Sequence, residues 1–190
     1  MKEFKRFILA SRSPRRKELL EKCGITFDCI PADIDETLDT SLSLTEAVED
    51  LSFRKASAIL AENEDAIVIG SDTIVTIDGE VLGKPADRKD ACRMLGMLSG
   101  RSHEVITGLC ILSRKRSYRN SSVAKVAFAE MDESEIVEYT ASGECDDKAG
   151  AYAIQGLGGK YITHIDGDYY SIMGLPLNMV YEELKNASLY

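Results

Sequence analysis

Apolar residues along the 190-residue chain follow two patterns, short continuous runs and a spacing of three or four residues. Short apolar runs at 7–10, 27–31 and 66–75 are typical of strands, and the third is rich in Ile and Val. Between the second and third runs, the stretch from Thr45 to about Ala61 carries apolar residues at three- and four-residue spacing. That spacing predicts a long amphipathic helix. The alternation of strands and helices predicts an α/β fold.

Capping and turn residues mark the other expected elements. Ser13 is a favourable N-cap and Pro14 suits the first helical position, so a helix is expected from Pro14 to Lys22, ended by Gly24. The remaining expected elements are a turn at 78–79, a helix capped by Asp87 and ending at Leu98, paired strands at 104–112 and 122–129 around a basic turn, a helix from Asp132 to about Ala141, strands at 161–165 and 169–173, and a last helix from about Pro176.

The composition is that of an ordinary globular protein, with 44% hydrophobic and 29% charged residues. Its length predicts one domain over residues 1–190, with enough chain to bury a core. The formal net charge of -9 argues against a broad nucleic-acid or membrane surface, because both partners are anionic. We therefore expect neither nucleic acid nor a membrane among the partners.

The cysteines and the apolar runs of the sequence indicate the cellular compartment of the protein. The five cysteines are an odd number and include no C-x-x-C pair, which favours reduced thiols over a disulfide framework. The apolar run at 7–10 is shorter than a signal-peptide core of about 7–15 residues. No run approaches the roughly 20 residues of a membrane span. The sequence thus predicts a cytoplasmic protein.

Three charged residues occupy unusual positions. Asp72 interrupts an apolar strand, where an unpaired carboxylate costs several kcal/mol. Lys55 shares the apolar face of the expected helix, and Lys84 follows a short strand just before Pro85. Each has an ordinary explanation: a turn-capping aspartate, a snorkelling lysine and a turn lysine. The alternative is functional: Asp72 reaches a cation, a metal or the carboxyl edge of the sheet, and the Lys55 ammonium points into a cleft.

The residues Arg15 and Arg16 add a fourth anomaly. They lie in the first turn of the expected helix, whose N-terminus already carries about half a positive charge. An anion bound there would remove the conflict. With carboxylates at Asp72 and in 33–36, the set suits a polyphosphate with Mg2+ or Mn2+. The histidines His103 and His164 are expected to be polar strand-edge residues, and neither has the spacing of a zinc ligand.

Eight segments, in order along the chain, resemble one known family. They are "LASRSPRRKELL", "DIDE", "RKA", "GSDTIV", "LGKP", "MLGMLSGRSHEVITG", "DKAGAYAIQGLGG" and "GLPL". The chain is similar to the Maf-type nucleotide pyrophosphatases, also called septum formation proteins. This resemblance implies an α/β fold related to inosine triphosphate pyrophosphatases, in which two lobes flank a central cleft around a long mixed sheet. It also implies hydrolysis of a nucleoside triphosphate between the α and β phosphates, a divalent metal such as Mg2+ or Mn2+, and a homodimer.

The same resemblance implies roles for individual residues. Asp72 matches the family's proton acceptor, which activates or orients the attacking water, and Asp72 and Glu36 are the expected metal ligands. Lys55 and Lys84 complete the expected catalytic set with them. The expected substrate-binding residues are Ser11, Ser13, Arg15, Arg16, Thr73 and Gln155.

Three of these positions bear on base choice. The combination of Arg15, Thr73 and Gln155 resembles the subfamily that acts on dTTP and UTP rather than on 7-methyl-GTP. A pyrimidine nucleoside triphosphate is therefore the expected substrate, since the Gln155 amide can donate to a base carbonyl and accept from a ring N–H. The alternative, motivated by the family's older name, is a nucleotide-binding regulator of cell division without significant hydrolysis.

Overall fold

The computed structural model describes residues 6–187, which form two compact units. The first unit contains the chain up to Asp72, residues 107–122 and the chain from Gly174 onward. The second contains 73–106 and 123–173. The two long strands at 102–113 and 116–128 contribute residues to both units.

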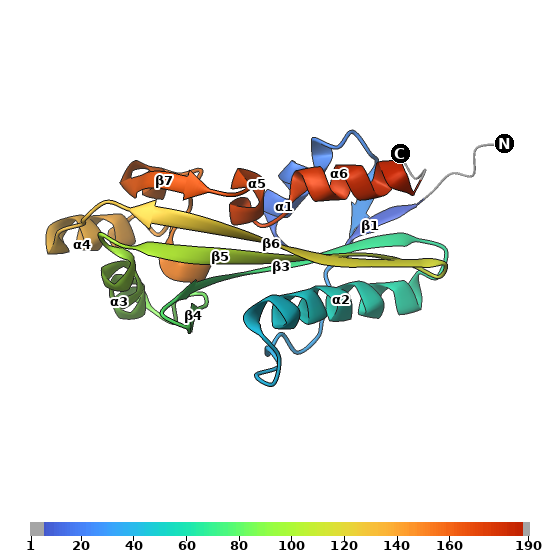
Figure 1. Cartoon of the computed structure of the whole chain (residues 1–190), viewed down its shortest axis with the longest axis horizontal. Helices are drawn as coiled ribbons and strands as arrows, with labels where there is room; N and C mark the ends of the chain where they lie inside the picture. The colour runs from blue at the N-terminus through green and yellow to red at the C-terminus, as the bar shows by residue number, and fades with distance from the viewer. Residues whose placement is uncertain (1–5, 188–190) are drawn as a thin grey trace. The chain divides into compact units, whose positions relative to one another are not determined.

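The first unit is a group of mainly parallel strands with helices on both faces (Figure 1). Its elements are β1 (Phe7–Leu9), α1 (Pro14–Glu21), β2 (Phe27–Cys29), α2 (Leu44–Glu62), the first part of β3 (Ile67–Ile77) and α6 (Leu177–Asn186). Strand β1 pairs in parallel with both β2 and β3. Figure 1 shows α2 along one face of these strands and α6 along the other.

The second unit contains antiparallel strands and short helices. Its elements are β4 (Glu80–Leu82), α3 (Arg88–Leu98), α4 (Glu133–Ala141), the 3-10 turns η1 (Ala149–Ala151) and η2 (Leu157–Tyr161), β7 (Ile162–Asp166) and α5 (Tyr169–Met173). Strands β5 (Ser102–Ser113) and β6 (Arg116–Phe128) complete a mixed sheet in the order β2-β1-β3-β5-β6-β7, with β4 paired to β3. The expected mixed α/β architecture is therefore confirmed.

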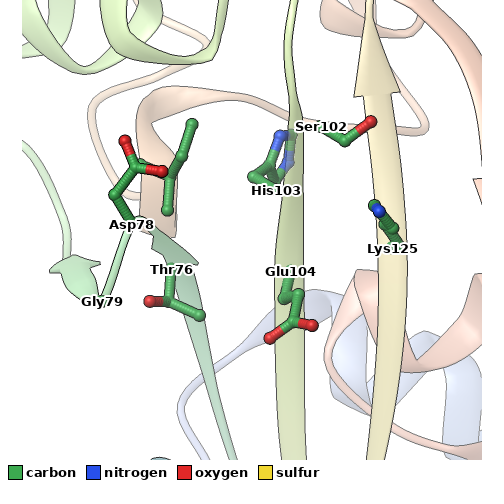
Figure 2. Close-up of a pocket in the computed structure, with 8 residues that line it drawn as sticks. Thr76, Asp78, Gly79, Ser102, His103, Glu104 and Lys125 are labelled. Carbon is green, nitrogen blue, oxygen red and sulfur yellow. The ribbon is translucent and has the colours of Figure 1, made fainter.

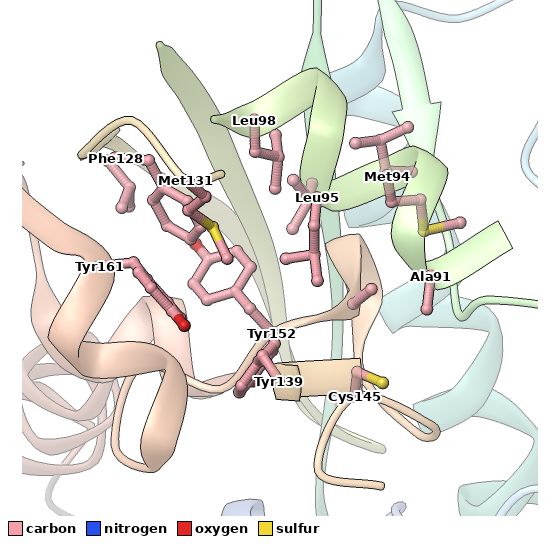
Figure 3. Close-up of a cluster of buried hydrophobic side chains, with 14 of the residues drawn as sticks. Ala91, Met94, Leu95, Leu98, Phe128, Met131, Tyr139, Cys145, Tyr152 and Tyr161 are labelled. Carbon is pink, nitrogen blue, oxygen red and sulfur yellow. The ribbon is translucent and has the colours of Figure 1, made fainter. Parts of the chain in front are cut away.

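Aromatic side chains pack among aliphatic and methionine side chains in the core of the second unit (Figure 3). Tyr152 packs edge-to-face on Phe128 with ring centroids 4.8 Å apart, and Tyr139 does the same with Tyr161 at 5.9 Å. Such geometries let the positive ring edge meet the negative ring face. The segment that carries Tyr152 is thus fixed from the core side.

Helix starts follow the expected capping chemistry. The Ser13 side chain accepts a hydrogen bond from the Arg16 backbone N–H, and Pro14 opens α1 as expected. Helix α2 starts at Leu44, one residue earlier than expected, because Ser43 and Glu46 form a capping box. Helix α4 has the expected capping box between Asp132 and Glu135.

The strand expected at 169–173 is wrong: this segment is the helix α5. The Asp168 carboxylate accepts a hydrogen bond from the Tyr170 N–H at 2.9 Å, and its carbonyl accepts one from the Ser171 hydroxyl at 2.7 Å. Gly167 and Gly174, on either side, have positive φ angles of 125° and 116°, which end any extended strand there. The basic turn expected before residue 122 is also shorter than expected, since β6 begins at Arg116.

The expectation that His103 lies at a strand edge is wrong. Its side chain is 2% exposed in β5, and its Nε2 lies 2.8 Å from the Tyr152 hydroxyl. Burial lowers the pKa of His103 from 6.5 to about 4, so the ring is neutral at pH 7. His164, in contrast, is exposed on β7, the last strand of the sheet, as expected.

The buried His103 predicts a specific loss of stability in acid. Between pH 6.5 and about 4 the unfolded chain binds a proton at His103 that the folded chain does not. The free energy of unfolding should therefore fall by about 3 kcal/mol as the pH drops through this window, and the contribution is absent above it. Urea unfolding of the wild type and of His103→Gln at several pH values measures the difference. An equally steep pH dependence in both proteins would contradict the assignment, and His164→Gln should behave like the wild type.

Candidate active site

The first unit places the Lys55 ammonium between two carboxylates. Its Nζ lies 2.7 Å from Oδ1 of Asp72 and 3.0 Å from Oε2 of Glu36. The side chain of Lys55 is 7% exposed and that of Asp72 is 15% exposed, whereas Glu36 is 58% exposed. Three of the four residues expected in the catalytic set, Glu36, Lys55 and Asp72, therefore lie together. The ammonium of this group is buried, and the Glu36 carboxylate faces solvent.

Two glycines explain how Lys55 reaches Asp72. A Cβ at Gly70, two residues before Asp72 on β3, would lie 2.3 Å from the Ser52 carbonyl oxygen of α2. A Cβ at Gly108 on β5 would lie 2.5 Å from the Val48 carbonyl oxygen. Both glycines therefore let α2 lie directly on the strands, which brings its buried face onto Asp72.

The start of α1 forms a second part of the site. The Ser13 N–H donates to the Ser11 hydroxyl at 3.1 Å, and the Ser13 hydroxyl accepts from the Arg16 N–H at 3.4 Å. The Arg16 side chain donates through Nε to the Gly174 carbonyl at 2.8 Å. The expected residues Ser11, Ser13 and Arg16 are thus linked to one another, with Arg15 between Pro14 and Arg16 in the first helical turn.

The charges of both parts act on Arg16. Burial lowers the pKa of Arg16, the carboxylates of Asp72 and Glu36 counteract this shift, and the neighbouring Arg15 adds to it. The cation-crowded turn expected from the sequence is therefore real, and the two carboxylates compensate it in part. Cations, carboxylates and helix N–H groups of the first unit together form a place suited to a phosphate chain and a hard cation.

The other expected residues belong to the second unit. Thr73 follows Asp72 along β3 and so points to the opposite face of the strand. Lys84 and Gln155 are both exposed, the first after β4 and the second in a turn. The Gly150 N–H donates to the Gly83 carbonyl at 3.1 Å, which ties the segment before Gln155 to the residue before Lys84.

A polar depression in the second unit contains none of the expected site residues (Figure 2). Its lining residues are Thr76, Ile77, Asp78, Gly79, Ser102, His103, Glu104 and Lys125. Figure 2 shows them at the end of β3 and along β5 and β6. The two carboxylates outnumber the one ammonium, and His103 is neutral, so the lining does not suit a polyphosphate anion.

The carboxylates of Glu36 and Asp72 are the right kind of ligand for Mg2+ or Mn2+. These cations prefer oxygen donors, and Mg2+ is commonly held by one or two carboxylates together with substrate phosphates and water. Within residues 6–187 no cluster of three or more His, Cys, Asp or Glu side chains forms a ready-made metal cage. By the chemistry of their oxygen donors, Glu36 and Asp72 therefore fit Mg2+ or Mn2+.

The sequence pattern did not reveal one connection of the site. The Ser71 hydroxyl, on the residue before Asp72, lies 2.8 Å from the Gly108 carbonyl and 2.9 Å from the Gly174 carbonyl. The same Gly174 carbonyl accepts from Arg16. Three segments thus meet at the Gly174 carbonyl, namely the start of α1, β3 and the segment before α6. They are far apart in the sequence.

Comparison with solved structures defines the class. The fold is similar to that of the Staphylococcus aureus Ham1 protein, with a TM-score of 0.53 and 12% identity over 96% of this chain and 100% of that chain. It is also similar to a HAM1 protein from Coxiella burnetii, with a TM-score of 0.51 and 16% identity over the same shares of the two chains. The protein is an α/β protein of the Ham1 fold.

Comparison of sequences then gives the family. The sequence model described as "Maf-like protein" matches residues 6–187. A dTTP/UTP pyrophosphatase of Bacillus anthracis is 45% identical over 185 residues, 97% of each chain, and one of Bacillus cytotoxicus is 46% identical over 181 residues, 95% of each chain. The chain belongs to the Maf family, as the motifs indicated.

The close contact at Gly70 generates a prediction. A methyl group in Gly70→Ala must displace α2, because the Ser52 carbonyl would lie 2.3 Å from the new Cβ. The variant should lose about 1–3 kcal/mol of stability and hold Lys55 less closely to Asp72. Urea unfolding and a crystal structure of the variant measure both effects. Gly96→Ala in α3, where no heavy atom lies within 4 Å of the new Cβ, is the control. An unchanged α2 position would contradict the argument.

Proposed function

We propose that this protein hydrolyses dTTP and UTP between the α and β phosphates, releasing the nucleoside monophosphate and pyrophosphate. The observation that carries this proposal is the 45% identity to dTTP/UTP pyrophosphatases over 97% of the chain. The arrangement of Lys55 between Asp72 and Glu36 supports it, because phosphoryl transfer depends mainly on positioning and charge compensation.

The first unit supplies the reacting groups in this proposal. The Asp72 carboxylate orients the attacking water and accepts its proton, while the water oxygen forms a new bond to phosphorus and the bond to the bridging oxygen breaks. Lys55 fixes the Asp72 carboxylate through its 2.7 Å contact. Arg15 and Arg16, with the Ser11 and Ser13 hydroxyls, bind phosphate oxygens at the start of α1.

The second unit supplies the remaining contacts in this proposal. The exposed Lys84 compensates the charge of the leaving pyrophosphate. Gln155 and Thr73 read the base, since an amide can donate to a pyrimidine carbonyl and accept from its ring N–H. Arg15, Thr73 and Gln155 form the set expected for dTTP and UTP.

Mg2+ or Mn2+ belongs to the proposal as a cofactor held by Asp72 and Glu36. When bound, such a cation supplies charge compensation to the phosphate oxygens. Titrating metal into the protein with a non-hydrolysable triphosphate, followed by calorimetry, tests the site without turnover. A Glu36→Gln variant should bind the metal more weakly.

The assembly and location of the protein are further parts of the proposal. Residues 1–190 are proposed to act as one Maf domain that forms a homodimer in the cytoplasm. Cys29, Cys92, Cys110 and Cys145 are free thiols, which suits a reducing compartment. None of the helices within residues 6–187 is long and apolar enough to cross a membrane. Light scattering of the purified protein measures the oligomeric state.

A nucleotide panel tests the substrate class. With Mg2+ or Mn2+ present, the protein should release pyrophosphate fastest from dTTP, UTP or close analogues, because Gln155 complements the pyrimidine edge. The release is measured with a coupled pyrophosphate assay across purine and pyrimidine triphosphates. Activity confined to purine triphosphates would contradict the specificity. Nucleotide binding without hydrolysis with any metal would instead favour a regulatory binding protein.

A further inference from the structure

A carboxylate that none of the site assignments includes holds the loop of Gln155. Oε1 of Glu144 accepts a hydrogen bond from the Leu157 N–H at 2.9 Å, and Oε2 accepts one from the Gly158 N–H at 3.0 Å. The Tyr139 hydroxyl donates to the same Oε2 at 2.8 Å. Three donors therefore converge on one side chain, as in an anion nest that the protein fills with its own carboxylate.

The Tyr139 hydroxyl also contacts the other side of this loop. It accepts a hydrogen bond from the Ala153 N–H at 3.2 Å while donating to Glu144. Burial and the contact with Glu144 raise the pKa of Tyr139, so the hydroxyl keeps its proton and remains a donor. Tyr139 and Glu144 together hold residues 153 and 157–158, and Gln155 lies between the held positions.

The backbone between these positions is tightly closed. The Gly156 N–H donates to the Ala153 carbonyl at 3.3 Å, and the Gly159 N–H donates to the Gly156 carbonyl at 3.0 Å. A Cβ at Gly156 would lie 1.9 Å from Oε1 of Glu144, so the carboxylate lies directly against the loop backbone. Gln155 is exposed, in a loop whose backbone amides at 153 and at 156–159 all donate hydrogen bonds within the protein.

The start of the segment is fixed as well. Tyr152 is bound to His103 at 2.8 Å, and Gly150 donates to the Gly83 carbonyl at 3.1 Å. The bonds to Glu144 and Tyr139 therefore add to contacts that fix the segment at its start. Burial opposes ionisation of Glu144, yet the two backbone N–H groups and Tyr139 outweigh it and hold the pKa of Glu144 below its usual value.

We propose that Glu144 and Tyr139 are positioning residues for base recognition, which hold the 153–158 loop so that Gln155 meets the pyrimidine edge. This inference rests on the proposed function, in which Gln155 reads the base. A fixed amide discriminates between uracil and cytosine because these bases exchange a carbonyl for an amino group and a ring N–H for a bare nitrogen. A loosened loop lets the amide turn, and the discrimination falls.

Enzyme kinetics on matched variants test the proposal. Glu144→Gln keeps the shape of the side chain but replaces one acceptor oxygen with an NH2 group, which cannot accept from a backbone N–H. Tyr139→Phe removes only the hydroxyl. Each variant should lower the ratio of kcat/KM for UTP to that for CTP by about tenfold, mainly through KM for UTP. The control is Glu138→Gln. Glu138 is exposed on α4, the helix that carries Tyr139, and the variant should keep the wild-type ratio.

A double-mutant cycle separates positioning from general support. If Glu144 acts through Gln155, the variant Glu144→Gln with Gln155→Ala should be no less selective than Gln155→Ala alone. A wild-type ratio in Glu144→Gln and Tyr139→Phe would overturn the proposal. Glu144→Gln could instead lower kcat equally for every nucleotide, with a loss that adds to that of Gln155→Ala. This result would also overturn the proposal, because it would show a purely structural role for Glu144.

Hydrogen exchange tests the loop without turnover. The amides of Leu157 and Gly158 should exchange at least tenfold faster in Glu144→Gln than in the wild type, while amides of β5 keep their protection. Unchanged exchange at both amides would overturn the proposal. If the wild type hydrolyses no pyrimidine triphosphate, the proposed function fails, and the exchange experiment still decides whether Glu144 holds the loop. If Glu144→Gln does not fold, Tyr139→Phe is used for both measurements, with exchange read at Ala153, whose N–H donates to the Tyr139 hydroxyl.

Discussion

The site depends on one buried ammonium held by two carboxylates. Lys55 is 7% exposed, and its Nζ contacts Asp72 at 2.7 Å and Glu36 at 3.0 Å. Removing a charge from water costs several kcal/mol, so a lysine on a buried helix face needs such partners. The close approach of α2 at Gly70 places the ammonium there. The position of α2 therefore decides how closely the Lys55 ammonium approaches the Asp72 carboxylate.

This ion-pair arrangement is better explained by chemistry than by stability. Buried salt bridges are often no more stabilising than apolar side chains of similar volume. Glu36 is 58% exposed and Asp72 15% exposed, so the carboxylates of the cluster are not sealed from solvent. The start of α1 adds Arg16, where the carboxylates of Asp72 and Glu36 oppose the lowering of its pKa by burial. Fixed charges of both signs are what a phosphate chain and its metal need from a protein.

Much of the first unit could be predicted from the sequence because its signals are local. The spacing of apolar residues predicts Lys55 on the buried face of α2. The position of Asp72 in an apolar run predicts that its carboxylate reaches a cation, a metal or the carboxyl edge of the sheet, and the cation is what the structure shows. The Ser13–Pro14 pair placed the start of α1. The charged cluster followed from these three features together with the family motifs.

The features that could not be predicted from the sequence depend on contacts between residues far apart in the chain. Such contacts leave no local pattern in the sequence. Ser71 meets the carbonyl of Gly174, 103 positions away. Glu144 meets Leu157 across 13 positions, and the sequence around it is that of an ordinary polar loop. Helix α5 was mistaken for a strand because its aromatic and branched residues favour strands, whereas the bonds to Asp168 decide its conformation.

Turnover of Asp72→Asn tests the central claim most directly. Asparagine keeps an oxygen for Lys55 but cannot accept a proton from water, so kcat for UTP should fall by about 10²–10⁴-fold. The variant should keep its fold, because Glu36 still pairs with Lys55, but at a lower melting temperature, because the buried ammonium loses one of its two carboxylates. Asp78→Asn, at the exposed end of β3, should keep wild-type turnover. Near-normal turnover in Asp72→Asn would contradict the account, because the lysine-bound carboxylate would then not be the reacting group.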